Sequence, residues 1–385
     1  MTQNIFPITY FKDQEVFIQN IKKLCNKELN PNLKKWEKDE LFPNSVFTTL
    51  GKEGYLGLLL PEKYGGVDGD YKLAGAWCET FGEVCAVGMT VGVNMHSLVV
   101  SHALSMYGSK SMKDKYLPSA VLGEKIGAYA FTEPGAGSDL QSISTKAIKK
   151  DNKWIINGSK TFITNATRDG FLLVLTKTKW DAKPYEFTTF VVDANNPGFR
   201  VSSKLDKLGW RSSDTAELVF DNVEVDDSAI LGKIGQGWSL AMKNLNWERL
   251  MLVLTTLGAV KQCYSECLEY VKDRKAFNQR IIDFDYSKML LNKMYLKIKQ
   301  GEALSYKALD DFCSGKDCRL LVALAKRKVC DDAVWIADKS IQFHGGYGYT
   351  KEYNPERWWR DLRLMPIGGG TSEIMAQVAS KCIGF

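Results

Sequence analysis

The sequence lacks the features of several large classes of protein. Its nine cysteines include no C-x-x-C pair, and its three histidines, His96, His102 and His344, are too few to form metal sites with them. No uncharged run is long enough to span a bilayer, and the first residues have no basic segment leading into an apolar one. We therefore expect reduced, mostly packed thiols, no metal, no membrane insertion and a cytoplasmic location.

Length and composition are those of a globular protein. The 385 residues are 45% hydrophobic and 25% charged, enough for two or three domains with a large core. Lys and Arg exceed Asp and Glu by 51 to 45, a net charge of +6, but the charges are interspersed. This balance mildly favours anionic substrates and gives little support for a nucleic-acid partner.

The hydrophobic pattern changes twice along the chain. It is helical up to about residue 122, with a long apolar stretch over 91–107. Short β-rich runs such as 171–175 and 187–192 follow between about 128 and 225, and helical segments return at roughly 238–274, 285–312, 318–342 and 372–383. The order of the chain is therefore helix, sheet, helix, and we place the domain boundaries at 1–124, 125–232 and 233–385.

Two segments of the middle block have the composition of a ligand-binding surface. Residues 131–139 read Phe-Thr-Glu-Pro-Gly-Ala-Gly-Ser-Asp, so that backbone N–H groups and short polar side chains can approach a flat ring or a pyrophosphate. In residues 154–165 the Asn157-Gly158 pair predicts a hairpin turn, after which Phe162 and Thr164 point the same way. A dinucleotide fingerprint would need glycine where Leu140 stands, which disfavours a nicotinamide enzyme.

A glutamate interrupts an apolar helical run at 245–254. Leu245, Met251 and Leu252 are the helical neighbours of Glu248, and Arg249 faces about a quarter-turn away. Such a carboxylate either pairs with a distant cation or is a general base whose pKa is raised by burial into the useful range of about 6–7. Both interpretations remain open from the residues alone.

Two further segments are ambiguous by themselves. Residues 342–349 hold three glycines after a helical run, more than a helix end requires, while His344 is interpreted as a cap or packing residue. Residues 270–279 look like a solvated basic helix end around Arg274.

Taken together, these segments resemble the acyl-CoA dehydrogenase family over nearly the whole chain. With the helix, sheet, helix order, the resemblance implies an α+β multi-domain fold: an N-terminal α-helical domain, a middle β-barrel or sandwich domain and a C-terminal four-helix bundle. It implies FAD as cofactor and a homotetramer, or a dimer, in which Gln342 and the paired glycines reach the adenosine portion of a neighbouring subunit's flavin. The cofactor-binding residues that it implies are Tyr129, Phe131, Thr132, Gly137, Ser138, Phe162, Thr164, Arg274, Phe277, Gln342, Gly345, Gly346, Thr371 and Glu373.

The same resemblance assigns the catalytic base. Many members of the family carry it near the C-terminus, where this chain has Gly369. A subgroup similar to isovaleryl-CoA and long-chain acyl-CoA dehydrogenases carries it on the internal helix, in the sequence Glu248-Arg249-Leu250 found here. This implies FAD-dependent α,β-dehydrogenation of an acyl thioester, with Glu248 abstracting the α proton and flavin N5 taking the β hydride. An N–H of the Gly369-Gly370 loop would then bind the thioester oxygen.

Departures from the family pattern leave the substrate open. Asn278 replaces a glycine and Asp285 a glutamine near the flavin, while Asn246 and Ser239 replace an aspartate and a tyrosine that contact the substrate in relatives. CoA is favoured over an acyl-carrier protein as the thioester carrier, and an electron-transfer flavoprotein is the expected acceptor. Two alternative functions remain open: a flavin oxidase or monooxygenase, and a non-catalytic binding protein. The substrate-binding residues we expect are Ser138, Asn246, Arg249, Gly369 and Gly370.

Overall fold

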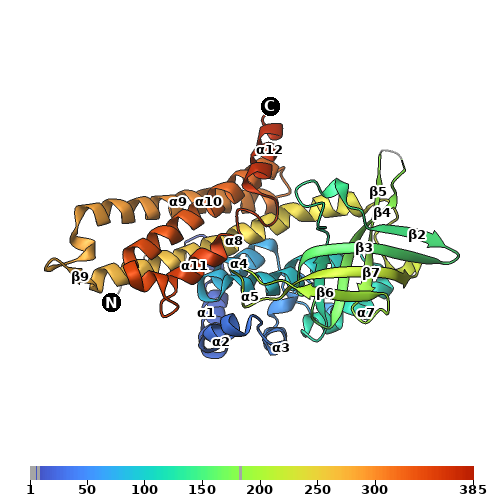
Figure 1. Ribbon diagram of the computed structural model, residues 1–385, viewed down its shortest axis with the longest axis horizontal. Coiled ribbons are helices and arrows are strands. Elements are labelled where there is room, and N and C mark those ends of the chain that lie inside the picture. Colours follow the sequence, from blue (N-terminus) through green and yellow to red (C-terminus); the bar gives the residue numbers. More distant parts are fainter. Residues whose placement is uncertain (1–5, 7–8, 182–183) are drawn as a thin grey trace.

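The computed structural model describes residue 6 and residues 9–181 and 184–385 of the chain. Figure 1 shows an elongated molecule in which a sheet occupies one end and long helices extend to the other. A layer of shorter helices from the first third of the sequence packs beneath both. The helix, sheet, helix order predicted from the sequence is confirmed.

The N-terminal part is helical, as predicted. Its helices are α1 (Glu15–Leu24), α2 (Leu33–Asp39), α3 (Ser45–Lys52), α4 (Tyr71–Val84), α5 (Val87–Asn94), α6 (His102–Tyr107) and α7 (Lys110–Val121). The apolar stretch over 91–107 runs through α5 and α6, joined by a π-helical segment, Met95–Ser101. This wider helical winding is uncommon and occurs mostly at functional sites. Here it packs against both the sheet and the long helix α8.

The middle block forms one eight-stranded mixed sheet. Its strands are β1 (Ile126–Ala130), β2 (Lys146–Lys150), β3 (Lys153–Thr164), β4 (Gly170–Lys179), β5 (Glu186–Asp193), β6 (Phe199–Lys204), β7 (Thr215–Val225) and β8 (Ile230–Leu231). The order is β6-β7-β3-β2-β4-β5-β8, with β1 pairing with β4. Only Lys146 and Lys177 pair between β2 and β4, so the sheet bends there into two halves. Apolar residues of both halves form one core cluster, including Trp154, Leu172 and Phe220.

The predicted hairpin turn at Asn157-Gly158 is wrong. Strand β3 runs straight through it, and the turn lies earlier, at Asp151-Asn152, where Asp151 has φ 54°. Gly158 instead sits at a bulge with φ 152°, and a Cβ there would lie 2.4 Å from Thr145 Oγ1. Glycine is therefore needed here because the chain at Thr145 approaches closely. An Asn-Gly pair is found at such bulges as well as in turns, so the local sequence does not distinguish the two.

Three long helices dominate the C-terminal part. They are α8 (Gly237–Asp273), α9 (Asp285–Cys313) and α10 (Arg319–His344), with α12 (Ser372–Cys382) packed on α10. The four helical segments predicted here are confirmed, whereas α11 (Pro355–Leu362) and the small hairpin β9 (Lys275–Ala276) and β10 (Gln279–Arg280) were not predicted. No helix among the described residues combines the length and the apolar character needed to cross a membrane.

Two glycines set the position of α8 against α4. A Cβ on Gly258 would lie 1.8 Å from the backbone oxygen of Glu79, and one on Gly82 would lie 2.3 Å from that of Thr255. The two helices therefore pack backbone to backbone, which fixes the helix that carries Glu248.

Replacing Gly258 by alanine is expected to lower the free energy of unfolding by about 1–3 kcal/mol, because the added methyl group overpacks a rigid contact. Thermal and denaturant unfolding measure it. The control is Gly301→Ala on α9, where the nearest atom is the end of a Val329 side chain at 3.0 Å. Equal unfolding midpoints for the two variants would contradict the close packing.

Candidate active site

The carboxylate of Glu248 lies in the first third of α8 without a polar partner. Its side chain is only partly exposed, between the buried Trp247 and Arg249. Among the described residues no hydrogen bond or ion pair reaches it. Burial raises its pKa to about 7, against the lowering effect of the cations Arg249 and Lys326. A carboxyl group with this pKa can accept and release a proton near neutral pH.

A glycine turn packs on α8 at Arg249 and Leu252, one and four residues after Glu248. Arg249 Nε donates to the Gly369 carbonyl at 3.1 Å, and Lys326 Nζ donates to the carbonyls of Gly370 and of Met365, the latter at 3.0 Å. Gly369 and Gly370 have φ of 67° and 102°. In the described chain neither of their N–H groups donates to another residue. The turn therefore directs its carbonyls to two cations and leaves two N–H groups for a ligand oxygen.

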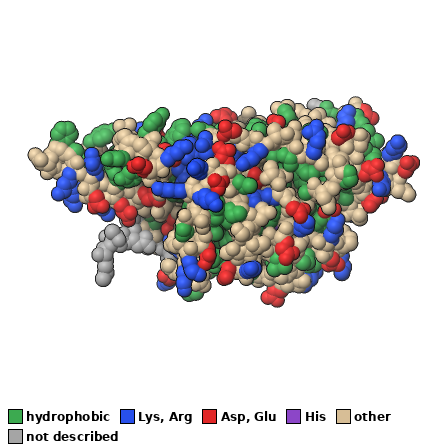
Figure 2. Space-filling view, turned by 60° about the horizontal axis from the view of Figure 1, so that its bottom comes forward, with side chains coloured by type: hydrophobic (Ala, Val, Ile, Leu, Met, Phe, Trp, Pro, Cys, Tyr) green, Lys and Arg blue, Asp and Glu red, His purple; other side chains and the backbone are tan. Residues whose placement is uncertain are grey.

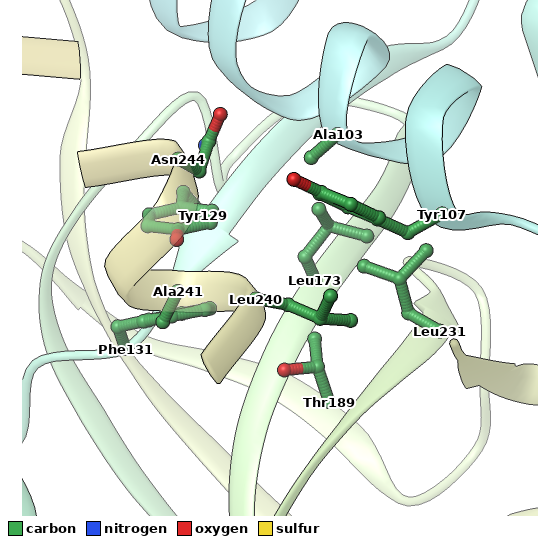
Figure 3. Close-up of a pocket in the computed structure, with 10 residues that line it drawn as sticks. All are labelled: Ala103, Tyr107, Tyr129, Phe131, Leu173, Thr189, Leu231, Leu240, Ala241 and Asn244. Carbon is green, nitrogen blue, oxygen red and sulfur yellow. The ribbon is translucent and has the colours of Figure 1, made fainter. Parts of the chain in front are cut away.

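A small cavity lies one turn before Glu248 along the same helix. Figure 3 shows its lining, with the side chains of Tyr129 and Asn244 next to each other and Tyr107 across from them. Its volume is about 10 Å³, enough for one water-sized group. The buried Nδ2 of Asn244 has no hydrogen-bond partner among the described residues. The cavity is thus a mostly apolar recess with a few polar groups, one helical turn before the candidate base.

The 131–139 segment forms a tight turn at the edge of the sheet. Glu133 and Ala136 exchange both backbone hydrogen bonds at 3.0 Å. A buried ion pair holds the turn from below: Lys160 Nζ lies 2.9 Å from Glu133 Oε1 and donates to the Phe131 carbonyl at 3.0 Å. A Cβ added at Gly135 would meet nothing within 4 Å, so the upper side of the turn is open.

Aromatic and hydroxyl side chains surround this open surface. Tyr129 and Phe131 stack with ring centroids 3.8 Å apart. Thr132 accepts a backbone hydrogen bond from Thr161 at 2.9 Å, which ties the turn to β3. Phe162 is 67% exposed and has φ 61°, a strained backbone for a bulky residue. An exposed aromatic ring held at a strained position indicates a flat ligand surface.

The remaining predicted residues at this end of the molecule lie around the turn and the base. Gly137 and Ser138 are exposed on the open turn, and Thr164 is partly exposed at the end of β3. Thr371 caps α12 by accepting from the Ile374 N–H at 3.2 Å, and Glu373 is exposed one turn on. Asn246 is partly exposed on α8, two residues before Glu248.

The other predicted cofactor residues lie at the far end of the long helices. Arg274 follows Glu248 by 26 residues of α8 and its cap, about 39 Å along the helix axis. The α10 end meets it there, because Tyr270 stacks on His344 with centroids 4.0 Å apart. Figure 1 shows the β9–β10 hairpin at the opposite end from the sheet. One chain therefore does not bring all the predicted cofactor residues to one site.

The residues of this far cluster are exposed on the surface of the chain. Phe277 is 91% exposed and, with Asn278, has positive φ at the hairpin tip, where asparagine serves in place of the family's glycine. Gln342, Gly345 and Gly346 are exposed, and a Cβ on either glycine would meet nothing within 4 Å. Figure 2 shows hydrophobic side chains on the surface at this end of the molecule. His344 donates from Nδ1 to the Ser340 carbonyl, 2.7 Å away, as a packing residue.

Several residues of the site were missed in the sequence. Lys326 is fully buried and follows the apolar run 320–325, the same signal that singled out Glu248. Lys160 gave no such signal, because it stands between polar residues of a strand. Asn244 could be found only from its place on the helix face of Glu248, one turn earlier.

The residues present fit a flavin nucleotide. The near cluster offers an open turn of backbone N–H groups, an exposed ring and threonine hydroxyls, which suit an isoalloxazine edge. The far cluster offers an exposed arginine and side-chain-free glycines, which suit phosphates and an adenosine.

Comparison with known proteins agrees with this fit. Three family profiles match in succession: acyl-CoA dehydrogenase N-terminal domain over residues 12–124, middle domain over 128–223 and C-terminal domain over 235–383. An acyl-CoA dehydrogenase of Bacillus subtilis (strain 168) is 34% identical over 372 residues, covering 96% of this chain and 97% of that one. A mitochondrial isovaleryl-CoA dehydrogenase of Oryza sativa subsp. japonica is 34% identical, covering 96% and 90%. The crystal structure of acyl-CoA dehydrogenase from Geobacillus kaustophilus superposes with a TM-score of 0.94 at 34% identity and covers all of both chains.

Proposed function

The chain belongs to the acyl-CoA dehydrogenase family, whose members are FAD-dependent oxidoreductases, and we propose that it oxidises the α,β bond of an acyl-CoA with Glu248 as the base. The observation that supports this most directly is the unpaired carboxylate of Glu248 beside a glycine turn with free N–H groups. The position often used for the base in relatives is Gly369 here, so a second candidate carboxylate is not available there.

Each residue has a defined task in this reaction. Glu248, ionised above its pKa of about 7, removes the α proton of the thioester. The N–H groups of Gly369 and Gly370 donate to the thioester oxygen, where negative charge develops as the proton leaves. Met251 and Leu252, the buried helical neighbours of Glu248, limit the access of water to the carboxylate. FAD, when bound, supplies the acceptor for the β hydride.

The near cluster would hold the reactive end of FAD. We assign the ring surface to Tyr129, Phe131, Phe162 and Thr164, and the open turn to Thr132, Gly137 and Ser138. Thr371 and Glu373 close the site from α12. Ser138 and Asn246 also stand where the carrier part of the thioester would pass.

The test is anaerobic bleaching of flavin absorbance by a panel of acyl thioesters, each offered on CoA and on an acyl-carrier protein. Rapid bleaching by a CoA ester is the expected result and identifies the acyl chain. Bleaching by the carrier-bound ester alone would show that the enzyme acts on carrier-protein thioesters. Asn246 is a reason to test this alternative, because it replaces an aspartate that contacts the substrate in relatives. Absence of bleaching by the whole panel would overturn the proposal.

We also propose that the enzyme is a homo-oligomer, a tetramer or a dimer, and that it passes electrons to an electron-transfer flavoprotein. The separation of about 39 Å between Glu248 and Arg274 supports the first point, because one extended cofactor then needs residues of two copies. In this arrangement Arg274, Phe277, Gln342, Gly345 and Gly346 complete the flavin site of a neighbouring copy. Rapid peroxide formation in air would instead favour an oxidase.

Mixing two inactive variants should restore activity if sites are shared between copies. Glu248→Gln removes the base, and Arg274→Met removes a phosphate contact from the neighbouring site. A mixed oligomer contains some sites with neither change, so joint refolding or co-expression is expected to recover roughly a quarter of the wild-type rate in a dimer with random pairing. Lys275→Met, on the next residue, is the control that should retain activity. No recovery on mixing would contradict a shared site.

A further inference from the structure

Lys326 stands out among the buried charges of the molecule. It lies on α10 with none of its side chain exposed, and no carboxylate forms an ion pair with it among the described residues. Its acceptors are two backbone carbonyls, those of Met365 and Gly370. A buried ammonium group without an anionic partner is costly for the fold, so a stabilising role does not explain it.

Both acceptors belong to the segment that links α11 to α12. This segment has internal backbone bonds on either side of Gly369 and Gly370: the N–H groups of Ile367 and Gly368 both donate to Leu364 at 2.9 Å, and Ser372 N–H donates to Pro366 at 2.9 Å. Between them the Gly369 carbonyl is held by Arg249 and the Gly370 carbonyl by Lys326. The C=O of one residue and the N–H of the next belong to the same trans peptide and point in opposite directions. Arg249 therefore sets the direction of the Gly370 N–H, and Lys326 sets that of the Thr371 N–H.

We propose that Lys326 is a positioning residue for catalysis: it fixes the peptide between Gly370 and Thr371 while Arg249 fixes the one before it, so that the N–H groups of this turn meet the thioester oxygen beside Glu248. The inference rests on the proposed function and deepens it. Arg249 and Lys326 approach the turn from two helices, α8 and α10, so that neither alone fixes both peptides.

The positive charge of Lys326 has a second effect, on the pKa of Glu248. The groups that act on the Glu248 carboxylate are Arg249 on α8, Lys326 on α10 and the phenol of Tyr129 on β1. Burial raises the pKa of Glu248, and the two cations hold it down. Lys326 itself is flanked by the Cys330 thiol and Asp331 on its own helix, and burial lowers its pKa.

The experiment compares Lys326→Met with Lys328→Met in the FAD-loaded enzyme. Lys328 is on the same helix but pairs with Asp332 at the surface, so its replacement should leave turnover and the pH profile unchanged. For Lys326→Met, kcat is expected to fall about tenfold to a hundredfold, as for a displaced oxyanion donor. The midpoint of the kcat–pH profile should move to higher pH, while the unfolding temperature stays the same or rises.

The outcomes separate this inference from the proposed function. If none of the thioesters bleaches the flavin of the wild type, the proposed function fails. If the wild type is active and Lys326→Met matches it in kcat and pH midpoint, Lys326 is not a positioning residue. Should Lys326→Met not fold, Lys326→Gln, which keeps a donor without the charge, takes its place: the pH midpoint should still rise, and kcat should fall by less than tenfold. Failure of both to fold while Lys328→Met folds would overturn the proposal in favour of a structural lysine.

Discussion

Replacing Glu248 by glutamine is expected to lower kcat by about a thousandfold or more while the protein still binds FAD. The amide has nearly the shape of the carboxyl group, so packing on α8 is preserved, but it cannot take the α proton. Steady-state turnover and flavin absorbance measure the two effects. Glu269→Gln, an exposed glutamate on the same helix, is the control and should retain full activity.

The pH dependence gives an independent check of the same residue. Since the ionised carboxylate is the active form and burial raises its pKa to about 7, turnover of the wild type should rise tenfold per pH unit below about 7 and level off above it. If the residual turnover of Glu248→Gln still falls at low pH in the same way, the titrating group is not Glu248.

The effect of ionised Glu248 on the stability of the fold should be opposite to its effect on turnover: stability should fall as the pH rises. A carboxyl group whose folded-state pKa lies above its unfolded value of about 4.3 costs stability as the pH rises from there to about 7. Glu248→Gln should therefore raise the unfolding temperature more at pH 8 than at pH 5. Equal changes at the two pH values would show that the carboxylate is not held in an unfavourable environment.

Glu248, the proposed base, could be singled out in the sequence because its signal is local. An apolar helix face with a single carboxylate can be read from i±3 and i+4 neighbours, and the helix over 238–274 is confirmed within a residue at each end. The same reasoning applied to the helix of Lys326 would have found its buried cation. Its function could not have been found, because the carbonyls of Met365 and Gly370 come from a segment about 40 residues away.

Other features of the site depend on long-range geometry that the sequence does not display. Asn157-Gly158 has the composition of a turn, but a neighbouring strand at Thr145 makes it a bulge within β3. Arg274 carries a family motif, yet nothing in that motif states that the helix extends it about 39 Å away from Glu248. The motifs indicate the expected chemistry, and the fold shows that one copy of the chain does not bring all of these residues to one place.

The ion pair under the turn that we propose binds the flavin should have a large effect on both stability and cofactor binding. Lys160 and Glu133 are 0% and 3% exposed, and Glu133 also accepts from the Ser144 N–H at 2.6 Å and the Thr145 N–H at 3.0 Å. Burial alone would raise the pKa of Glu133, but Lys160 and these donors lower it to about 2. Removing the lysine leaves this carboxylate buried with one charge unpaired.

We therefore expect Lys160→Met to lower the free energy of unfolding by about 3–5 kcal/mol at pH 7 and to release FAD, because the turn at 131–138 loses its support. Chemical denaturation and flavin content measure the two losses. Lys153→Met on the same strand breaks only an exposed pair with Glu224 and should cost under about 1 kcal/mol. The double variant with Glu133→Gln removes the stranded charge, so it should recover part of the stability but not the flavin content. Recovery of both would show that the turn keeps its shape without the pair and that the lysine serves stability alone.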